Sequence, residues 1–245
     1  MSTPPGLPPQ PEESRLIAPA WHTAMVAAFT FGIAGISAWR GSFAPVGKAS
    51  GEARLAGYAT VFLWEWLTVA FIVWGVRLRG FQMSELIGGS WSGVGAFFRD
   101  WGIAILFLLC STVILGTIQF ALHARPNQAV RDILPQTTTE KIVWIFVAAT
   151  AGFCEETIFR GYFQQQLGRM TRSASVGLVL QALIFGVCHG YQGWKSVITI
   201  SVFGGLFGLL AARMKSLRPG MLAHFTEDSA TGLLLPWALK RMGGA

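Results

Sequence analysis

Residues 101–122 read WGIAILFLLCSTVILGTIQFAL, and these 22 residues contain no charged side chain and no histidine. About 20 apolar residues in a helix suffice to cross the roughly 30 Å hydrocarbon core of a bilayer. The whole chain agrees with this local signal, because 52% of its 245 residues are apolar and only 13% are charged. Soluble domains carry about 25% charged residues. The composition therefore indicates an integral membrane protein and argues against a soluble globular one.

Similar apolar stretches recur along the chain and predict an all-α fold, a polytopic transmembrane helix bundle. We expect about seven spans, within a range of six to eight, at residues 19–39, 55–76, 102–122, 141–163, 174–190, 196–213 and 219–238. Between two of them, the glycine- and tryptophan-containing segment 78–101 is expected to be interfacial or partly re-entrant. Lys and Arg are divided almost equally between the two sides of this bundle, so their distribution predicts no orientation.

The net charge of +7 could suggest a nucleic-acid partner. The basic residues, however, occur singly or in pairs at the ends of apolar segments, where Lys and Arg anchor helices at the membrane interface. We therefore expect membrane lipid and no nucleic acid as a partner. Three cysteines, at positions 110, 154 and 188, lie inside apolar stretches and predict no disulfide framework.

Ionisable residues inside the apolar segments are few and clustered. Each costs roughly 2.5–3.5 kcal/mol at the centre of a membrane helix on insertion scales, so each needs a reason. They are Glu65, Glu155, Glu156, Arg160, His189, His224, Glu227 and Asp228. Most of them could line one polar chamber within the bundle. Glu65 belongs to no motif; it could relay protons, join the chamber, or pair with Arg54 or Arg77 at a helix end.

The first cluster is Cys154-Glu155-Glu156-Thr157-Ile158-Phe159-Arg160. Helical spacing places Glu156 and Arg160 one turn apart, in the order that favours an ion pair, while Glu155 points about 100° away. One carboxylate would be neutralised and the other left free to act as a general base. The alternative is a salt bridge that only closes a helix end.

Two histidine motifs follow. Phe185 and His189 are one turn apart on one apolar segment, and His224 and Asp228 are one turn apart on another. A carboxylate one turn from an imidazole can fix its tautomer, donate to an oxyanion when protonated, or join it as a metal ligand. Either motif could instead be a packing residue or a hydrogen bond between helices.

Together, the three motifs Glu-Glu-x-x-x-Arg, Phe-x-x-x-His and His-x-x-x-Asp resemble the signature of the CPBP family of intramembrane proteases. This family includes the type II CAAX prenyl endopeptidases and the bacterial Abi proteins. The resemblance extends from Glu155 to Asp228 and includes flanking residues such as Phe159-Arg160-Gly161. Composition predicts a disordered Pro-rich tail at 1–15 and transmembrane helices with an interfacial segment at 16–139. The resemblance adds a catalytic core at 140–245.

The resemblance implies a peptidase, an intramembrane endopeptidase whose site lies in a water-accessible intramembrane cavity. By this resemblance Glu155 activates water with His189 as its partner, and Glu156 and Arg160 hold that end of the site. Phe185 shapes the substrate-binding side, and His224 and Asp228 stabilise the oxyanion. The implied substrate is a protein or peptide, with one prenylated or membrane-anchored near its C-terminus as the leading candidate. The implied location is an integral, multi-pass membrane protein, in the cell membrane if the host is bacterial.

Two alternatives remain open at this point. Glu155, His189 and His224 could instead be three ligands of a catalytic zinc, with water as the fourth. We favour chemistry without a cofactor, because a glutamate pair held by Arg160 beside a free carboxylate already accounts for the first motif. The chain could also be a non-proteolytic membrane scaffold or a transporter, whose buried charges would form an ion path.

Overall fold

The computed structural model describes residues 15–43, 50–124 and 128–242. All but the last residue of the expected tail at 1–15 lies outside these described residues. The described elements are helical, with no strand among them: α1 Ala20–Phe43, α2 Gly51–Arg77, α3 Met83–Ile87, α4 Val94–Ala121, α5 Gln128–Ile133, α6 Thr138–Glu155, the π-helix η2 Glu156–Gln164, α7 Gln165–Thr171, α8 Ala174–Cys188, the 3-10 turn η3 Gly190–Gln192, α9 Trp194–Met214 and α10 Arg218–Met242. The predicted all-α fold is confirmed.

Six of the seven predicted apolar segments overlap one helix each, and the segment 141–163 covers α6 and η2. Four helical stretches of the described chain are long and apolar enough to cross a membrane: Gly51–Arg77, Val94–Ala121, Thr138–Thr171 and Trp194–Met214. Two shorter apolar helices, Ala20–Ile36 and Ala174–Cys188, accompany them. The structure is therefore that of a membrane helix bundle, while the full number of spans stays a prediction.

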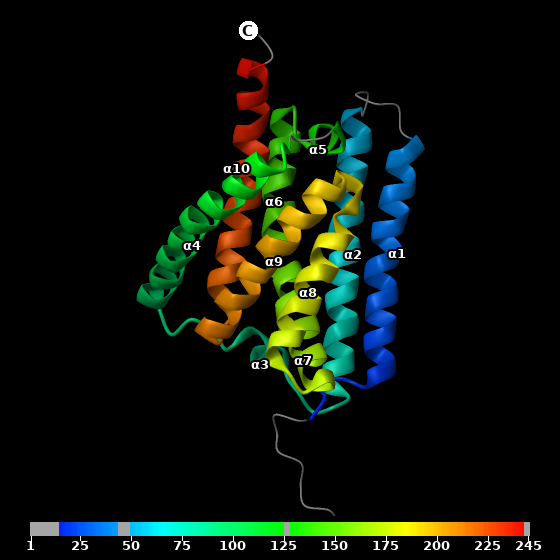
Figure 1. Cartoon of the computed structure of the whole chain (residues 1–245), viewed down its shortest axis with the longest axis vertical. Helices are drawn as coiled ribbons and strands as arrows, with labels where there is room; N and C mark the ends of the chain where they lie inside the picture. Colours follow the sequence, from blue (N-terminus) through cyan, green and yellow to red (C-terminus); the bar gives the residue numbers. More distant parts are fainter. Residues whose placement is uncertain (1–14, 44–49, 125–127, 243–245) are drawn as a thin grey trace, which may run out of the picture.

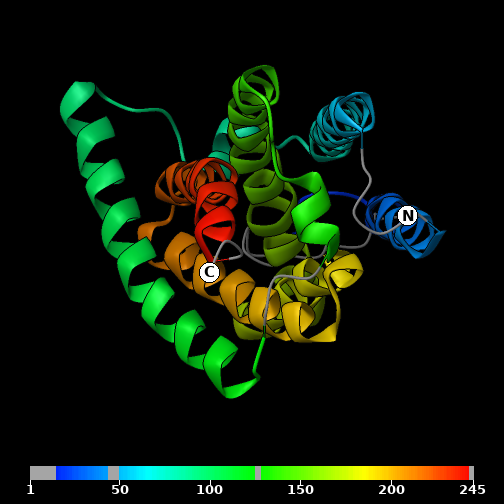
Figure 2. The ribbon, with the colours of Figure 1, turned by 90° about the horizontal axis from the view of Figure 1, so that it is seen from above.

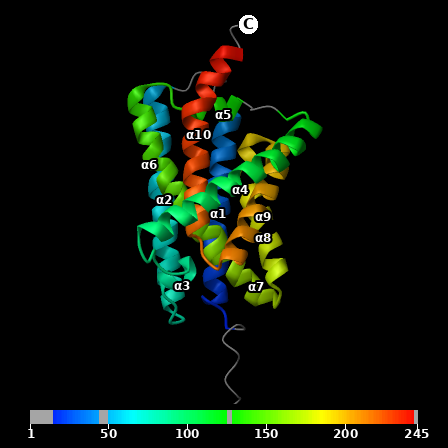
Figure 3. The same ribbon diagram turned by 90° about the vertical axis from the view of Figure 1, so that its left-hand side faces the viewer.

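Most of the long helices run roughly parallel or antiparallel, whereas α4 and α9 are inclined to them (Figure 1). Seen from above, α4 lies along one side of the bundle and α1 lies on another (Figure 2). Between them, α6, α8, α9 and α10 surround the centre. The first motif begins at the end of α6 and continues on η2, the second lies at the end of α8, and the third lies on α10. Figure 3 shows α4 passing across α10 and α9, with α3 at the end of the bundle where α10 begins.

Helix α4 begins at Val94, eight residues earlier than the predicted segment. The prediction started after Arg99 and Asp100, since charged residues are costly within a membrane helix. In the structure the carboxylate of Asp100 is satisfied, because Arg99 Nη2 lies 2.9 Å from Oδ1 and Trp91 Nε1 donates to Oδ2 at 3.0 Å. The helix can therefore continue through both residues.

The predicted interfacial segment contains α3, which attaches to the start of α10. The Leu217 amide donates to the Ile87 carbonyl at 2.8 Å, and the Ser216 hydroxyl donates to the same oxygen at 3.2 Å. Gly88 ends α3 at φ +83°, and a Cβ there would lie 2.4 Å from the Lys215 carbonyl oxygen. Only glycine accepts both this left-handed conformation and this close contact. The segment thus positions the helix that carries His224.

Helices α6 and α10 pack at backbone distance just before the first motif. A Cβ on Gly152 would lie 2.8 Å from the Met221 carbonyl oxygen and 2.9 Å from the Phe225 amide nitrogen. Small residues allow membrane helices to approach this closely. The contact brings the residues that follow Gly152 directly against His224.

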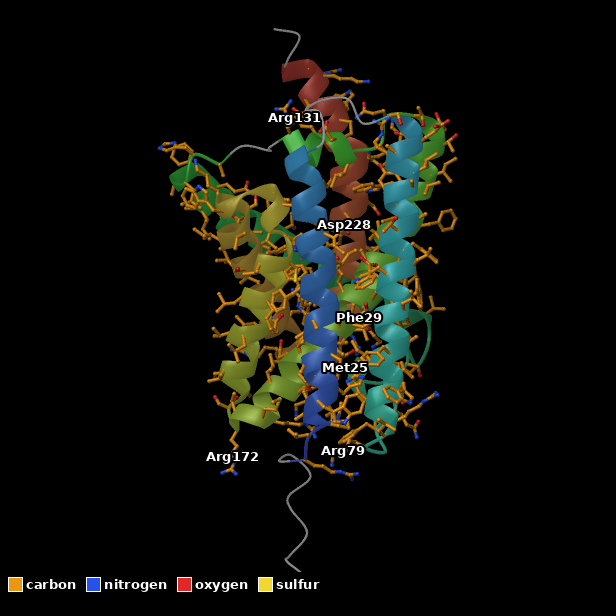
Figure 4. All side chains as sticks on the ribbon, turned by 90° about the vertical axis from the view of Figure 1, so that its right-hand side faces the viewer. Met25, Phe29, Arg79, Arg131, Arg172 and Asp228 are labelled. Atoms are coloured by element: carbon orange, nitrogen blue, oxygen red, sulfur yellow. The ribbon has the colours of Figure 1, made fainter. Side chains whose placement is uncertain are left out.

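Helix α1 is bound to the rest of the bundle by buried hydrogen bonds. The His22 Nδ1 atom is 2.7 Å from the Tyr162 hydroxyl, and its Nε2 atom donates to the Phe71 carbonyl at 3.0 Å. Gln166 accepts from the Ile17 amide at 2.9 Å and donates to the Ala18 carbonyl at 2.8 Å. These bonds fasten the start of α1 to η2 and α7. The outer face of α1, with Met25 and Phe29, is exposed (Figure 4).

Candidate active site

The first motif lies where α6 becomes a π-helix. Helix α6 ends at Glu155, and η2 continues from Glu156 to Gln164 without a break in the rod. A π-helix has i→i+5 hydrogen bonds, is uncommon, and is frequent at functional sites. The adjacent residues Glu155 and Glu156 therefore stand at a change of helical pitch, which the sequence did not predict.

The predicted ion pair between Glu156 and Arg160 is present. Arg160 Nη1 donates to Glu156 Oε1 at 2.8 Å, and both side chains are 0% exposed. Arg160 Nη2 also donates to the Gly204 carbonyl of α9 at 3.3 Å. A buried charge needs such a partner, since desolvation would otherwise be very costly. Glu156 is thus bound and inaccessible, as the spacing predicted.

Two aromatic rings enclose the guanidinium of Arg160. Its Cζ atom lies 4.4 Å from the ring centre of Phe185 and 4.9 Å from that of Phe207. Cation–π contacts of this kind are strongest when the cation is desolvated. Phe185, predicted to shape the substrate side, is 3% exposed and packs against Arg160.

His224 lies at the centre of the cluster. Its Nδ1 atom is 3.1 Å from Glu156 Oε1, and its Nε2 atom is 3.6 Å from Glu155 Oε2 and 3.7 Å from Asp228 Oδ2. Because a carboxylate only accepts, Nδ1 carries the proton of the bond to Glu156. The opposite nitrogen then faces Glu155 and Asp228.

Glu155 and Asp228 form the more open side of the cluster. Their side chains are 19% and 28% exposed, compared with 0% for Glu156. Asp228 lies along the bundle between Arg131 near one end and Arg79 and Arg172 near the other (Figure 4). The site is therefore within the bundle and away from its charged ends. The water-accessible cavity itself stays a prediction.

His189 lies beside this cluster without bonding to it. Its Nδ1 atom donates to the Phe185 carbonyl at 2.9 Å, and its ring centre is 4.8 Å from the Phe185 ring. The Phe185 ring is also 6.2 Å from the His224 ring, so it separates the two imidazoles. No carboxylate among the described residues forms an ion pair or hydrogen bond with His189.

Two further residues, which belong to none of the three motifs, also lie at the site. Glu65, on α2, is 6% exposed, and its carboxyl group lies near the charged side chains of Glu155, His224 and Asp228. Tyr191, in the turn η3, stacks on His189 with ring centres 6.2 Å apart. Burial raises the pKa of the Tyr191 hydroxyl, and the negative charges of Glu155 and Asp228 raise it further, so this hydroxyl stays protonated. The sequence signal for Glu65 was its charge within an apolar segment; Tyr191 gave none.

The residues fit the zinc alternative poorly. A catalytic zinc needs three ligands about 2.0–2.2 Å from one point. Within the described part of the chain, no group of three or more His, Cys, Asp or Glu side chains is arranged to hold a metal ion. One ring nitrogen of each candidate histidine is bound, that of His189 by a backbone carbonyl and that of His224 by Glu156, which leaves Nε2 as the one ring atom that could reach a metal. We therefore route no step through a metal.

Comparison with known proteins gives one family. No significant match to a curated protein or to a solved structure was found. The family model described as Type II CAAX prenyl endopeptidase Rce1-like matches residues 137–230, the part of the chain that contains all three motifs. The match supports an intramembrane CAAX-type endopeptidase in general. Over these residues it supports the similarity to the CPBP family of CAAX proteases that the three motifs predicted.

Proposed function

We propose that this protein is an intramembrane endopeptidase in which Glu155 activates the hydrolytic water. The observation that carries the proposal is the contrast between two adjacent carboxylates. Glu156 is buried and bound by Arg160 and His224, whereas Glu155 is partly exposed and is bound by neither within hydrogen-bond distance. A general base must be reachable by water and free of a permanent cation. Glu155 meets both conditions.

The proposed reaction needs only this chain and water. Glu155 takes a proton from water as the water oxygen bonds to the scissile carbonyl carbon. The resulting oxyanion is stabilised by the imidazolium form of His224, in which Nδ1 donates to Glu156 and the Nε2–H group faces the open side of the cluster. The carbon–nitrogen bond then breaks, and Glu155 returns the proton to the leaving amine.

The remaining motif residues have supporting roles in this proposal. Glu156 and Arg160 fix the orientation of His224 through its Nδ1 atom. His189, whose Nδ1 proton is bound by the Phe185 carbonyl, presents Nε2 as an acceptor that can orient the water. Asp228, one turn from His224, acts as a neutral donor or orients the imidazole.

We further propose that the substrate is a protein or peptide prenylated or membrane-anchored near its C-terminus. We also propose that the enzyme is a multi-pass membrane protein, in the cell membrane if the host is bacterial. The test uses the purified protein in lipid vesicles with a farnesylated Cys-a-a-X peptide. Membranes containing the wild type or Glu155→Ala are compared in parallel for new protein C-termini.

The proposal predicts cleavage by the wild type and none by Glu155→Gln, which keeps the shape of the side chain and removes its basicity. Glu52→Gln is the matched control, because Glu52 is an exposed carboxylate in the first turn of α2. It should retain wild-type turnover. Normal turnover by folded Glu155→Gln would contradict the assignment of the base.

A further inference from the structure

The indole of Trp144, on α6, binds the backbone of the third motif. Its Nε1 atom donates to the main-chain carbonyl of Asp228 at 2.8 Å. A carbonyl oxygen has two lone pairs, so the indole can bind there without breaking the helical hydrogen bonds of α10. The carboxylate of the same Asp228 lies 3.7 Å from His224. Trp144 therefore contacts the segment that carries both site residues of α10, although it belongs to none of the three motifs.

Neighbouring residues fix the indole in place. Tyr58 of α2 packs edge-on against it with ring centres 5.4 Å apart, and the Tyr58 hydroxyl donates to the Ile133 carbonyl at 2.6 Å. On α10, Gly232 leaves the space that the indole occupies, because a Cβ there would overlap the Nε1 atom. Trp144 thus joins α2, α6 and α10 at one point.

Helix α10 is weakened directly after this contact. Pro236 lies inside the helix and has no backbone N–H, so the carbonyl of Gly232, four residues earlier, receives no helical hydrogen bond. Sharp kinks in helices occur mostly at such prolines. The last turns of α10 also extend beyond the neighbouring helices (Figure 3). Bending at the proline would therefore move His224 and Asp228 unless α10 is held between them and Pro236.

We propose that Trp144 is a positioning residue for Asp228, and that it clamps α10 between the site and the turn weakened by Pro236. Gly152 of α6 already holds α10 on the other side of His224, through its contacts with the backbone of Met221 and Phe225. The clamp completes this support and keeps the third motif against the first. Its effect on the reaction rests on the proposed function, whereas the clamp itself does not.

Two matched substitutions test the proposal with the farnesylated peptide in vesicles. Trp144→Phe keeps an aromatic ring and removes the donor. Because small displacements of reacting groups are costly, kcat should fall at least about tenfold with KM unchanged. Trp66→Phe is the control, since the Trp66 indole also donates to a residue of α6, the Thr150 hydroxyl at 3.4 Å, but to no residue of the motifs. It should keep the wild-type kcat.

A second variant displaces the indole from the side of α10. Gly232→Ala places a methyl group where the Nε1 atom of Trp144 lies, so it should give the same loss of kcat. Alanine favours a helix more than glycine does, so this loss would not come from a weaker helix. The test therefore does not depend on the folding of one variant.

Hydrogen–deuterium exchange of the same proteins tests the clamp without any substrate. Loss of the clamp opens α10 locally, so the amides of residues 228–235 should exchange at least about threefold faster in Trp144→Phe than in the wild type. In Trp66→Phe they should exchange at the wild-type rate. A double substitution separates positioning from general support. In an Asp228→Leu background, Trp144→Phe should cause no further loss of kcat, because the residue that it positions is already absent.

The proposal is overturned if folded Trp144→Phe has either the kcat or the exchange rates of Trp66→Phe. It is also overturned if Trp144→Phe lowers kcat by the same factor in Asp228→Leu as in the wild type, since Trp144 would then act independently of Asp228. If the wild type cleaves no peptide but the exchange rates behave as expected, the proposed function fails and the clamp stands.

Discussion

His224 and Arg160 share one acceptor, since His224 Nδ1 lies 3.1 Å and Arg160 Nη1 lies 2.8 Å from the same Oε1 atom of Glu156. One buried carboxylate therefore links the first motif to the third. Its second oxygen has no partner among the described residues. Any change to Glu156 or Arg160 should thus be transmitted to the imidazole.

Removal of Arg160 should cost stability as well as activity. Arg160→Leu leaves Glu156 buried without its cation, and loss of one partner of a buried pair costs about 3–5 kcal/mol. Thermal unfolding in detergent should show a large decrease in the midpoint, and peptide cleavage should be lost. Arg99→Leu is the control, because the Arg99 side chain is 61% exposed and Asp100 keeps Trp91 and Arg218 as partners. An Arg160→Leu protein as heat-resistant as this control would contradict the pair's role.

An added methyl group at Gly152 should move the first motif away from the third without changing any charged residue. In Gly152→Ala the new Cβ would press on the backbone of Met221 and Phe225 and push α10 away from α6. Overpacking of this kind costs about 1–3 kcal/mol, and His224 would move from Glu155. We expect a lower unfolding midpoint and a large loss of kcat. Gly116→Ala, on the open face of α4, should be neutral or stabilising by up to about 1 kcal/mol.

Substitutions of Asp228 test whether its side chain donates a hydrogen bond to the oxyanion in a reaction without metal. In Asp228→Asn a side-chain amide donates to an oxyanion without needing a proton. Chemistry without metal therefore predicts activity that is kept, or raised at alkaline pH, where a carboxyl group would lose its proton. Asp228→Leu, which cannot donate, should be impaired at every pH. The measurement is kcat/KM across the pH range, and equal loss in both variants would argue against a donor role.

Metal removal tests directly whether the reaction proceeds without zinc. Activity should survive exhaustive chelation, and elemental analysis of active protein should find well under one zinc per chain. Deprotonation of the attacking water by Glu155 needs no Lewis acid in the proposed reaction. Loss of activity with chelator and its return with zinc would instead make Glu155, His189 and His224 the ligands.

Much of this architecture followed from the sequence. Apolar length predicted where the seven long helices lie, because a span needs a fixed number of apolar residues. The i,i+4 spacing predicted the contact between Glu156 and Arg160, and the structure places them 2.8 Å apart. Both predictions depend on local geometry, which one helix determines by itself.

The remaining features depend on contacts between helices. No pattern within α2 indicates that Glu65 lies near Glu155 rather than an arginine, because that choice depends on how α2 packs against α6. Likewise, the resemblance gave Glu155 the partner His189, whereas His224 is the imidazole beside it in the structure. Local spacing also could not show that Phe185 lies against Arg160 instead of an open surface.

The π-helix η2 changes which face each residue occupies along the continuous helical rod from Thr138 to Thr171. An α-helix turns by about 100° per residue, and a π-helix, with its wider i→i+5 ring, turns by less. A helical wheel drawn from α6 therefore falls out of phase after Glu155 and assigns α7 to the wrong faces. Single-cysteine variants along this rod can be labelled with a water-soluble thiol reagent. The extent of labelling should vary with the α-helical period of about 3.6 residues in α6 and again in α7. The two patterns should be displaced from each other by the π-helical residues between Glu156 and Gln164.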